Sequence, residues 1–132
     1  MLGLTLLRKE ETMRRMSFML TGPQMRDKSK TVTRRLGWRF AKPGMVVLAV
    51  SQCQGLKPGQ KATIYGPIKI ISTRWERLDE MLDYKYGDIE ATKEGFPELG
   101  GGGFVRMFCE HMKTHIAPQL YVNRIEFEHL TA

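Results

Sequence analysis

A continuous apolar run from Met45 to Val50 constrains the fold of this chain more than any other stretch. A Lys-Pro-Gly turn at residues 42–44 precedes the run, and its length suits a strand better than a helix. A run of this kind is typical of a strand in a buried sheet. The remaining elements are therefore expected to supply the neighbours of this strand.

Several shorter strands are predicted, separated by Gly/Pro turns. The expected ranges are 16–21, 62–65, 67–74 and, as a half-buried strand with alternating apolar and polar residues, 121–128. Such spacing is typical of a small, mainly antiparallel sheet or barrel. We therefore expect an α+β fold in which a small β-barrel carries flanking helices.

The helical signals lie mostly in the second half of the chain. Short helices are predicted at 24–29, from Glu76 onward and at 88–94, and an amphipathic helix begins at Phe104. The four glycines at 100–103 lack the lysine and hydroxyl of a phosphate-binding P-loop, so they predict a flexible loop. Pro118 is expected to end the last helix.

Composition predicts one domain over residues 16–132, with residues 1–15 as an N-terminal basic arm or short helix. No apolar run is long enough to cross a membrane, and basic residues follow rather than precede the apolar opening, unlike a secretory signal. Cys53 and Cys109 are isolated thiols. These features predict a cytoplasmic protein that does not bind membranes.

The positive charge is concentrated at the start of the chain. Residues 1–42 hold eleven Lys/Arg against three acids, a net +8, whereas the remaining ninety residues hold ten against eleven, a net −1. A clustered excess favours an anionic partner such as nucleic acid, although a merely soluble basic protein would also show it. Trp38 and Arg39 lie within this region and suit base stacking beside phosphate contacts.

The segment from Lys30 to Arg35 is the strongest candidate for a functional site. It combines three cations with two threonines and has strand propensity. The alternative is a solvated edge strand protected by basic residues. A second signal is Glu94, which directly precedes Gly95-Phe96-Pro97, a helix-to-loop corner where a carboxylate can point into a cleft.

A metal site and a cofactor are not expected. His111 and His115 have a spacing that can place two imidazoles on one metal ion, but the sequence offers no evident third ligand.

With the basic segment after a short strand and turn, the Lys-Pro-Gly turn into a buried strand, and Glu94-Gly95-Phe96 before an aromatic helix, the chain resembles the ASCH domains of the PUA-like superfamily. The resemblance covers about residues 16–130. It implies a small β-barrel with a cleft that binds RNA or a modified nucleoside or nucleotide. Some members are similar to amidohydrolases acting on N4-acetylcytidine, and their Lys, Thr and Glu fall here on Lys30, Thr33 and Glu94. Others resemble ribonucleases, for which the corresponding residues are Lys30, Arg34 and Arg35.

The amidohydrolase chemistry is physically reasonable for these residue types. Burial or neighbouring cations lower the pKa of a lysine, and a neutral Lys30 is then able to take the proton of Thr33. The Thr33 alkoxide would attack the acyl carbon, while Glu94 protonates the leaving nitrogen or orients the pair. Residues three apart point to opposite faces of a regular strand, so this needs a turn or bulge between Lys30 and Thr33.

Three functions therefore remain open from the sequence. They are amide hydrolysis on a modified cytidine, metal-independent cleavage of single-stranded RNA, and RNA binding without catalysis. In the binding function Lys30, Arg34, Arg35, Arg39 and Trp38 are the expected nucleic-acid contacts.

Overall fold

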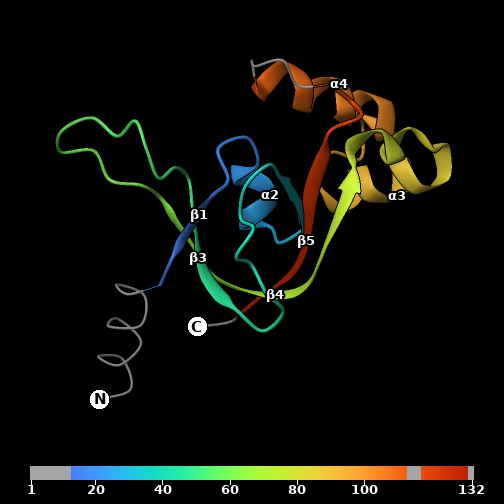
Figure 1. Cartoon of the computed structure of the whole chain (residues 1–132). Helices are drawn as coiled ribbons and strands as arrows, with labels where there is room; N and C mark the ends of the chain where they lie inside the picture. The colour runs from blue at the N-terminus through green and yellow to red at the C-terminus, as the bar shows by residue number, and fades with distance from the viewer. Residues whose placement is uncertain (1–12, 113–116, 131–132) are drawn as a thin grey trace.

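The computed structural model describes residues 13–112 and 117–130, and within them the fold is α+β, as expected (Figure 1). The strands are β1 (Arg15–Ser17), β2 (Val32–Arg35), β3 (Val46–Val50), β4 (Ile64–Arg77) and β5 (Tyr121–His129). The helices are α2 (Gly22–Arg26), α3 (Tyr84–Lys93), α4 (Gly100–Met112) and the 3-10 helix η1 (Leu78–Leu82). No helix in the described ranges combines the length and apolarity needed to cross a membrane.

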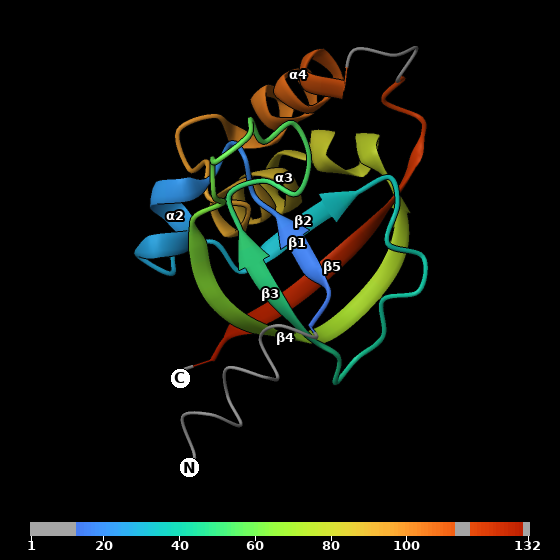
Figure 2. The same cartoon turned by 90° about the vertical axis from the view of Figure 1, so that its left-hand side faces the viewer.

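The five strands form one mixed sheet in the order β1-β3-β4-β5-β2. Only β1 and β3 are parallel, and the other three pairs are antiparallel, so the expected mainly antiparallel sheet is confirmed. Figure 2 shows β4 curving as a long arc beneath β3 and β5. The expected barrel is wrong, because edge strands β1 and β2 have no backbone pairing with each other and the sheet stays open.

The buried strand predicted from residues 45–50 is confirmed in position and environment. Residues 47–50 of β3 are at most 1% exposed, whereas Val46 at its start is 36% exposed. Of these residues, Val47 and Ala49 pack in a first core with Met16, Phe18, Ile70 and Phe127. A second core of Leu78, Met81, Phe104, Phe108 and Val122 joins η1, α3 and α4 to the far end of the sheet.

Strand β4 replaces the two short strands predicted at 62–65 and 67–74. Pro67, expected as the first residue of the second strand, lies within β4 instead. Because β5 ends at His129, opposite Ile68, the ladder partner of Pro67 is Leu48 of β3, and its carbonyl oxygen accepts from the Leu130 N–H at 3.1 Å. A missing N–H is tolerated at such a position. The strand also continues through Arg77, so the helix predicted from Glu76 begins only at η1.

The helix predicted at 88–94 begins earlier, at Tyr84, because the side chain of Asp83 caps it. Asp83 Oδ1 accepts a hydrogen bond from the Tyr86 backbone N–H at 2.9 Å. This satisfies one of the free donors of the first helical turn. At the other end of α3 lie Glu90 and the C-cap residue Glu94, whose backbone N–H donates to the Glu90 carbonyl oxygen.

The four glycines form the first turn of α4, so the prediction of a flexible loop is wrong. A Cβ atom on Gly101 would lie 1.9 Å from the carbonyl oxygen of Met81 and 2.7 Å from Cα of Gly87. Only glycine permits this approach of backbone to backbone. The glycines therefore serve close packing of α4 against η1 and α3, a constraint invisible in the local sequence.

Candidate active site

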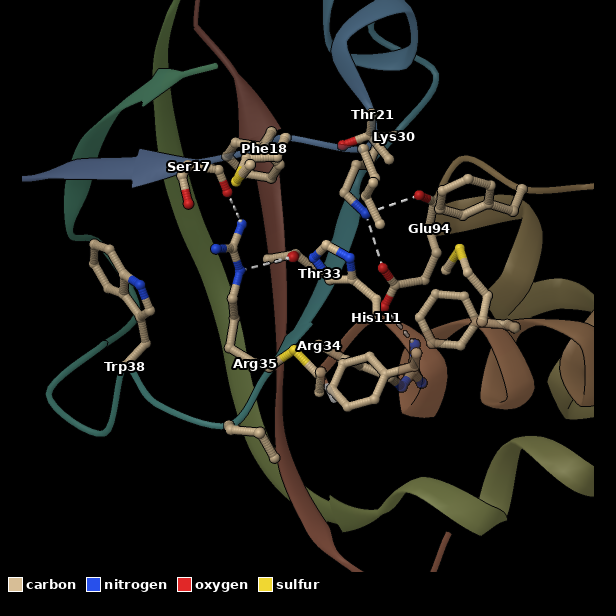
Figure 3. Close-up of a pocket in the computed structure, with 18 of the residues that line it drawn as sticks. Ser17, Phe18, Thr21, Lys30, Thr33, Arg34, Arg35, Trp38, Glu94 and His111 are labelled. Atoms are coloured by element: carbon tan, nitrogen blue, oxygen red, sulfur yellow. Dashed lines mark hydrogen bonds and ion pairs between the residues drawn. The ribbon is translucent and has the colours of Figure 1, made fainter. Parts of the chain in front are cut away.

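A cavity of about 330 Å³ lies between the residues that follow β1, strand β2 and helix α4 (Figure 3). Its polar lining includes Lys30, Thr33 and Arg35 from the segment at and before β2, and Glu94 from the end of α3. Its apolar lining includes the aromatic side chains of Phe18, Phe96, Phe104 and Phe108. The cavity therefore combines a small polar centre with flat apolar walls, as small-molecule sites do.

Lys30 supplies the amine of this polar centre and is only 3% exposed. Its Nζ donates to Glu94 Oε1 at 2.8 Å and to the Glu94 backbone carbonyl oxygen at 2.7 Å. Burial lowers the pKa of Lys30, and the neighbouring Glu94 carboxylate only partly opposes this shift. The predicted pairing of Lys30 with Glu94 is thus present as a direct contact.

Thr33 lines the same cavity as Lys30, despite the three-residue spacing. Pairing of β2 with β5 begins at Val32, so Lys30 lies before the regular strand. Its backbone is held instead by Gln24, whose carbonyl oxygen accepts from Lys30 N–H at 3.3 Å, and by His129, whose Nε2 lies 2.7 Å from the Lys30 carbonyl oxygen. The turn expected before the strand therefore lets both side chains reach one cavity.

Arg35 holds the Thr33 hydroxyl from the other side. Its Nε donates to Thr33 Oγ1 at 3.0 Å, and its Nη2 donates to the Ser17 carbonyl oxygen of β1 at 2.5 Å. The guanidinium carbon also lies 4.7 Å from the centre of the Phe18 ring. Burial lowers the pKa of Arg35 to about 10, so it remains charged at neutral pH.

Arg34 points to the opposite side of β2, where it lies among carboxylates. Its Nη2 lies 2.6 Å from Glu76 Oε1 and 2.5 Å from Glu90 Oε1, and its Nη1 lies 3.0 Å from Glu94 Oε2. The side chain is 0% exposed, so its partners here are carboxylates rather than the expected phosphates. We call this set, with Lys30 and Arg124, the buried ion network.

Sequence reasoning missed three members of the buried ion network, namely Glu76, Glu90 and Arg124. Arg124 Nε lies 2.5 Å from Glu90 Oε1, across the interface between β5 and α3. In the sequence these residues look like ordinary charges on a strand or helix face. The only available signal was an excess of charge within segments that otherwise alternate apolar and polar residues.

Of the two further residues expected to contact nucleic acid, Trp38 lines the cavity and Arg39 does not. Trp38 lines it, with its ring 4.8 Å from that of Phe40, whereas the exposed Arg39 lies over Trp75 at 5.6 Å. His111 also lines the cavity, while His115 lies outside the described residues. Among the residues that the structure describes, no three His, Cys, Asp or Glu side chains form a metal-binding group.

The buried ion network predicts a loss of stability in acid. Burial alone would raise the pKa of Glu90, but hydrogen bonds from Arg124 and Arg34 outweigh it and lower the pKa from 4.5 to about 2. Glu90 therefore contributes about 3 kcal/mol that is fully present above pH 4.5 and lost as the pH falls toward 2. Urea unfolding at several pH values should show this decline, and should show it unchanged in the control Glu98→Gln, which alters an exposed carboxylate. A flat profile between pH 5 and 2.5 would contradict the prediction.

No protein-family model, curated protein or solved structure matches this chain. Membership of the ASCH domains therefore stays a prediction from the sequence motifs. The function proposed below is therefore based on the geometry of the cavity and on the residues that line it.

Proposed function

We propose that this chain is a small amidohydrolase of the ASCH type, with an open variant of the PUA-like fold, that removes an acyl group from the exocyclic amine of a modified cytosine nucleoside. The observation that carries the proposal is the placement of the Lys30 amine. It is buried against Glu94 and lines the same cavity as the Thr33 hydroxyl. These are the residue types that a lysine-activated threonine nucleophile requires.

The hydrogen bonds of Lys30 orient its amine for proton transfer. A neutral amine has two hydrogens and one lone pair, and two donor positions are directed to the Glu94 carboxylate and backbone carbonyl. The lone pair of the Lys30 amine is then free to accept a proton from a group in the cavity. Thr33 Oγ1 accepts from Arg35, so its own proton remains available for Lys30.

The proposed reaction first forms and then hydrolyses an ester on Thr33. Lys30 takes the Thr33 proton, and Thr33 Oγ1 attacks the acyl carbon to form a tetrahedral intermediate. The intermediate collapses when the C–N bond breaks and the Lys30 ammonium returns the proton to the leaving nitrogen, which gives an ester on Thr33 and the free base. Water activated by Lys30 hydrolyses this ester and releases the carboxylic acid.

Glu94 is an orienting group in this scheme. Its Oε1 accepts from Lys30 and its Oε2 accepts from Arg34. Since both oxygens are already engaged as hydrogen-bond acceptors within the protein, neither is directed at the leaving nitrogen. Of the two roles expected for Glu94, the contacts support orientation of Lys30.

The cavity lining favours an uncharged nucleoside over a nucleotide. The walls combine aromatic rings with leucine and methionine side chains, and a volume of about 330 Å³ is at the lower end of small-ligand pockets. Arg34 is enclosed by carboxylates, and Arg35 is engaged by Thr33 and Ser17. Arg34 therefore presents no free edge to a phosphate, and Arg35 already uses Nε and Nη2 within the protein.

The test is the turnover of N4-acetylcytidine. We expect equimolar cytidine and acetate from the wild-type protein, measured by chromatography, and a transient acetyl adduct on Thr33 by mass spectrometry. Lys30→Met should abolish release, whereas Lys42→Met, which changes an exposed lysine, should leave the rate unchanged. The absence of cytidine from wild-type reactions would overturn the proposal.

A second candidate function, RNA binding, is supported by arginine–aromatic pairs outside the cavity. Arg14 lies 4.3 Å from the centre of the Phe40 ring, and Arg39 lies over Trp75. Phe40 and Trp75 are 43% and 44% exposed. Exposed aromatic rings beside cations suit the stacking and phosphate contacts of single-stranded RNA.

For RNA binding we expect an affinity that falls steeply with salt concentration. Fluorescence anisotropy with a labelled oligoribonucleotide should show Arg39→Ala and Trp75→Ala weakening binding about tenfold each, as loss of a stacked base does. Lys57→Ala, which alters an exposed lysine in another loop, is the control. The same oligoribonucleotide incubated with EDTA tests metal-independent cleavage, and intact RNA would exclude a ribonuclease. Salt-independent binding would contradict the electrostatic basis of this candidate.

A further inference from the structure

Arg34 is the centre of the buried ion network and makes contacts that the proposed reaction does not use directly. It donates to Glu76 through Nε and Nη2, to Glu90 through Nη2 and to Glu94 through Nη1. Its side chain is fully enclosed. Arg34 borders the cavity, but its side chain has no exposed area, so any part it plays in the site acts through Glu94.

The Glu94 carboxylate is shared between two cations. Lys30 Nζ lies 2.8 Å from Oε1, and Arg34 Nη1 lies 3.0 Å from Oε2. Because the two oxygens have different partners, rotation of the carboxylate would break both contacts. Arg34 thereby fixes the orientation of Glu94 Oε1, the oxygen that accepts the hydrogen bond from Lys30 Nζ.

Arg34 is itself held by elements that do not line the cavity. Glu76 comes from β4 and also accepts from the Tyr86 hydroxyl at 2.7 Å, while Glu90 comes from α3 and is paired with Arg124. The guanidinium therefore has little freedom to leave Glu94. A chain of ionic contacts thus extends from Arg124 through Glu90, Arg34 and Glu94 to Lys30.

We propose that Arg34 is a positioning residue that shares the Glu94 carboxylate with Lys30 and thereby keeps the Lys30 amine able to accept a proton. This rests on the proposed function for its chemical purpose. The physical reason is that a carboxylate also neutralised by Arg34 stabilises an ammonium less than one paired with Lys30 alone. The positive charge of Arg34 also disfavours the charged form of Lys30 and so lowers its pKa.

Other charged groups surround Lys30 and are left unchanged by the test below. Besides Glu94 and Arg34, they are Arg35 from β2, His111 of α4 at the same cavity, and His129 of β5, whose ring contacts the Lys30 carbonyl oxygen.

The experiment uses a charge-balanced double variant, Arg34→Met with Glu76→Gln, because loss of Arg34 alone would leave buried carboxylates without their partner. NMR titration of the Lys30 side chain in the full chain gives its pKa directly. We expect the pKa to rise by about one unit or more relative to wild type, as for an amine that gains sole use of a carboxylate. In the pH profile of kcat/KM for N4-acetylcytidine, the acidic limb should shift to higher pH by the same amount.

The matched control is Arg124→Met with Glu126→Gln, which also removes one buried arginine and one carboxylate. Arg124 contacts Glu90 and Glu126 but not Glu94 or Lys30, so the Lys30 pKa should stay within a few tenths of wild type, about the error of additivity between independent sites. An unchanged or lowered pKa in the Arg34 variant, or an equal rise in the control, would overturn the inference. The NMR titration needs no substrate, so it tests Arg34 even if N4-acetylcytidine is not hydrolysed.

Discussion

Replacing Gly101 by alanine should lower the free energy of unfolding by about 3 kcal/mol, the upper end of the cost of overpacking. The added methyl group would lie 1.9 Å from the Met81 carbonyl oxygen and within 3 Å of Gly87, both backbone groups that no rotamer change can move. Helix α4 would have to shift away from η1 and α3. Because α4 carries Phe104 and Phe108, the shift would also open the second core.

The neighbouring Gly102→Ala provides a matched control for Gly101→Ala. It lies in the same turn of α4, and beyond its chain neighbours and the backbone of its own helix no atom lies within 4 Å of the added Cβ. Alanine has the higher helix propensity, so this variant should be up to about 1 kcal/mol more stable than wild type. Urea unfolding measures both variants. Equal stability of the two variants would contradict the tight contact between α4, η1 and α3.

The second large effect is expected for Thr33→Val, which should reduce kcat for N4-acetylcytidine at least a thousandfold, as loss of a nucleophile does. Valine has nearly the same shape as threonine and suits a strand. The Arg35 Nε–H would lose its acceptor in Thr33 Oγ1, which should cost about 1 kcal/mol of stability. The loss of rate therefore cannot be attributed to unfolding.

Two controls separate the Thr33 hydroxyl from its strand. Thr33→Ser retains a hydroxyl and should keep measurable turnover, together with the acetyl adduct at residue 33. Thr31→Val changes a half-buried threonine that does not line the cavity and should match the wild-type rate. Normal turnover by Thr33→Val would mean that water attacks the amide directly, and the threonine step would be wrong.

The strands were predictable where side-chain pattern alone decides the structure. The apolar run of β3 and the alternation of β5 each predicted a strand, and both strands are present. The half-buried character expected for β5 is wrong, because the polar residues Asn123 and Arg124 are buried together with Val122 and Ile125. The glycines of α4 were mispredicted because a local rule treats four glycines as a helix breaker. Contact with Met81 and Gly87, distant in sequence, overrides that rule, and nothing in the local pattern reports such contacts.

The candidate site was predictable to a similar extent. The contact of Lys30 with Glu94, 64 residues away, followed from motif resemblance rather than from periodicity. The different environments of Arg34 and Arg35 follow from strand alternation, which places adjacent residues on opposite faces. What lies on each face was not readable, because the carboxylates around Arg34 come from β4 and α3.

The open edge of the sheet acquires a meaning from the position of Arg35. One guanidinium contacts the Ser17 carbonyl oxygen on β1 and the Thr33 hydroxyl on β2, the two strands that backbone hydrogen bonds leave unjoined. A change in the separation of these strands would pull on both contacts at once. In a closed barrel the ladder between them would fix that separation. Here the Arg35 side chain couples the two: if the distance between β1 and β2 changes, the orientation of the Thr33 hydroxyl changes with it.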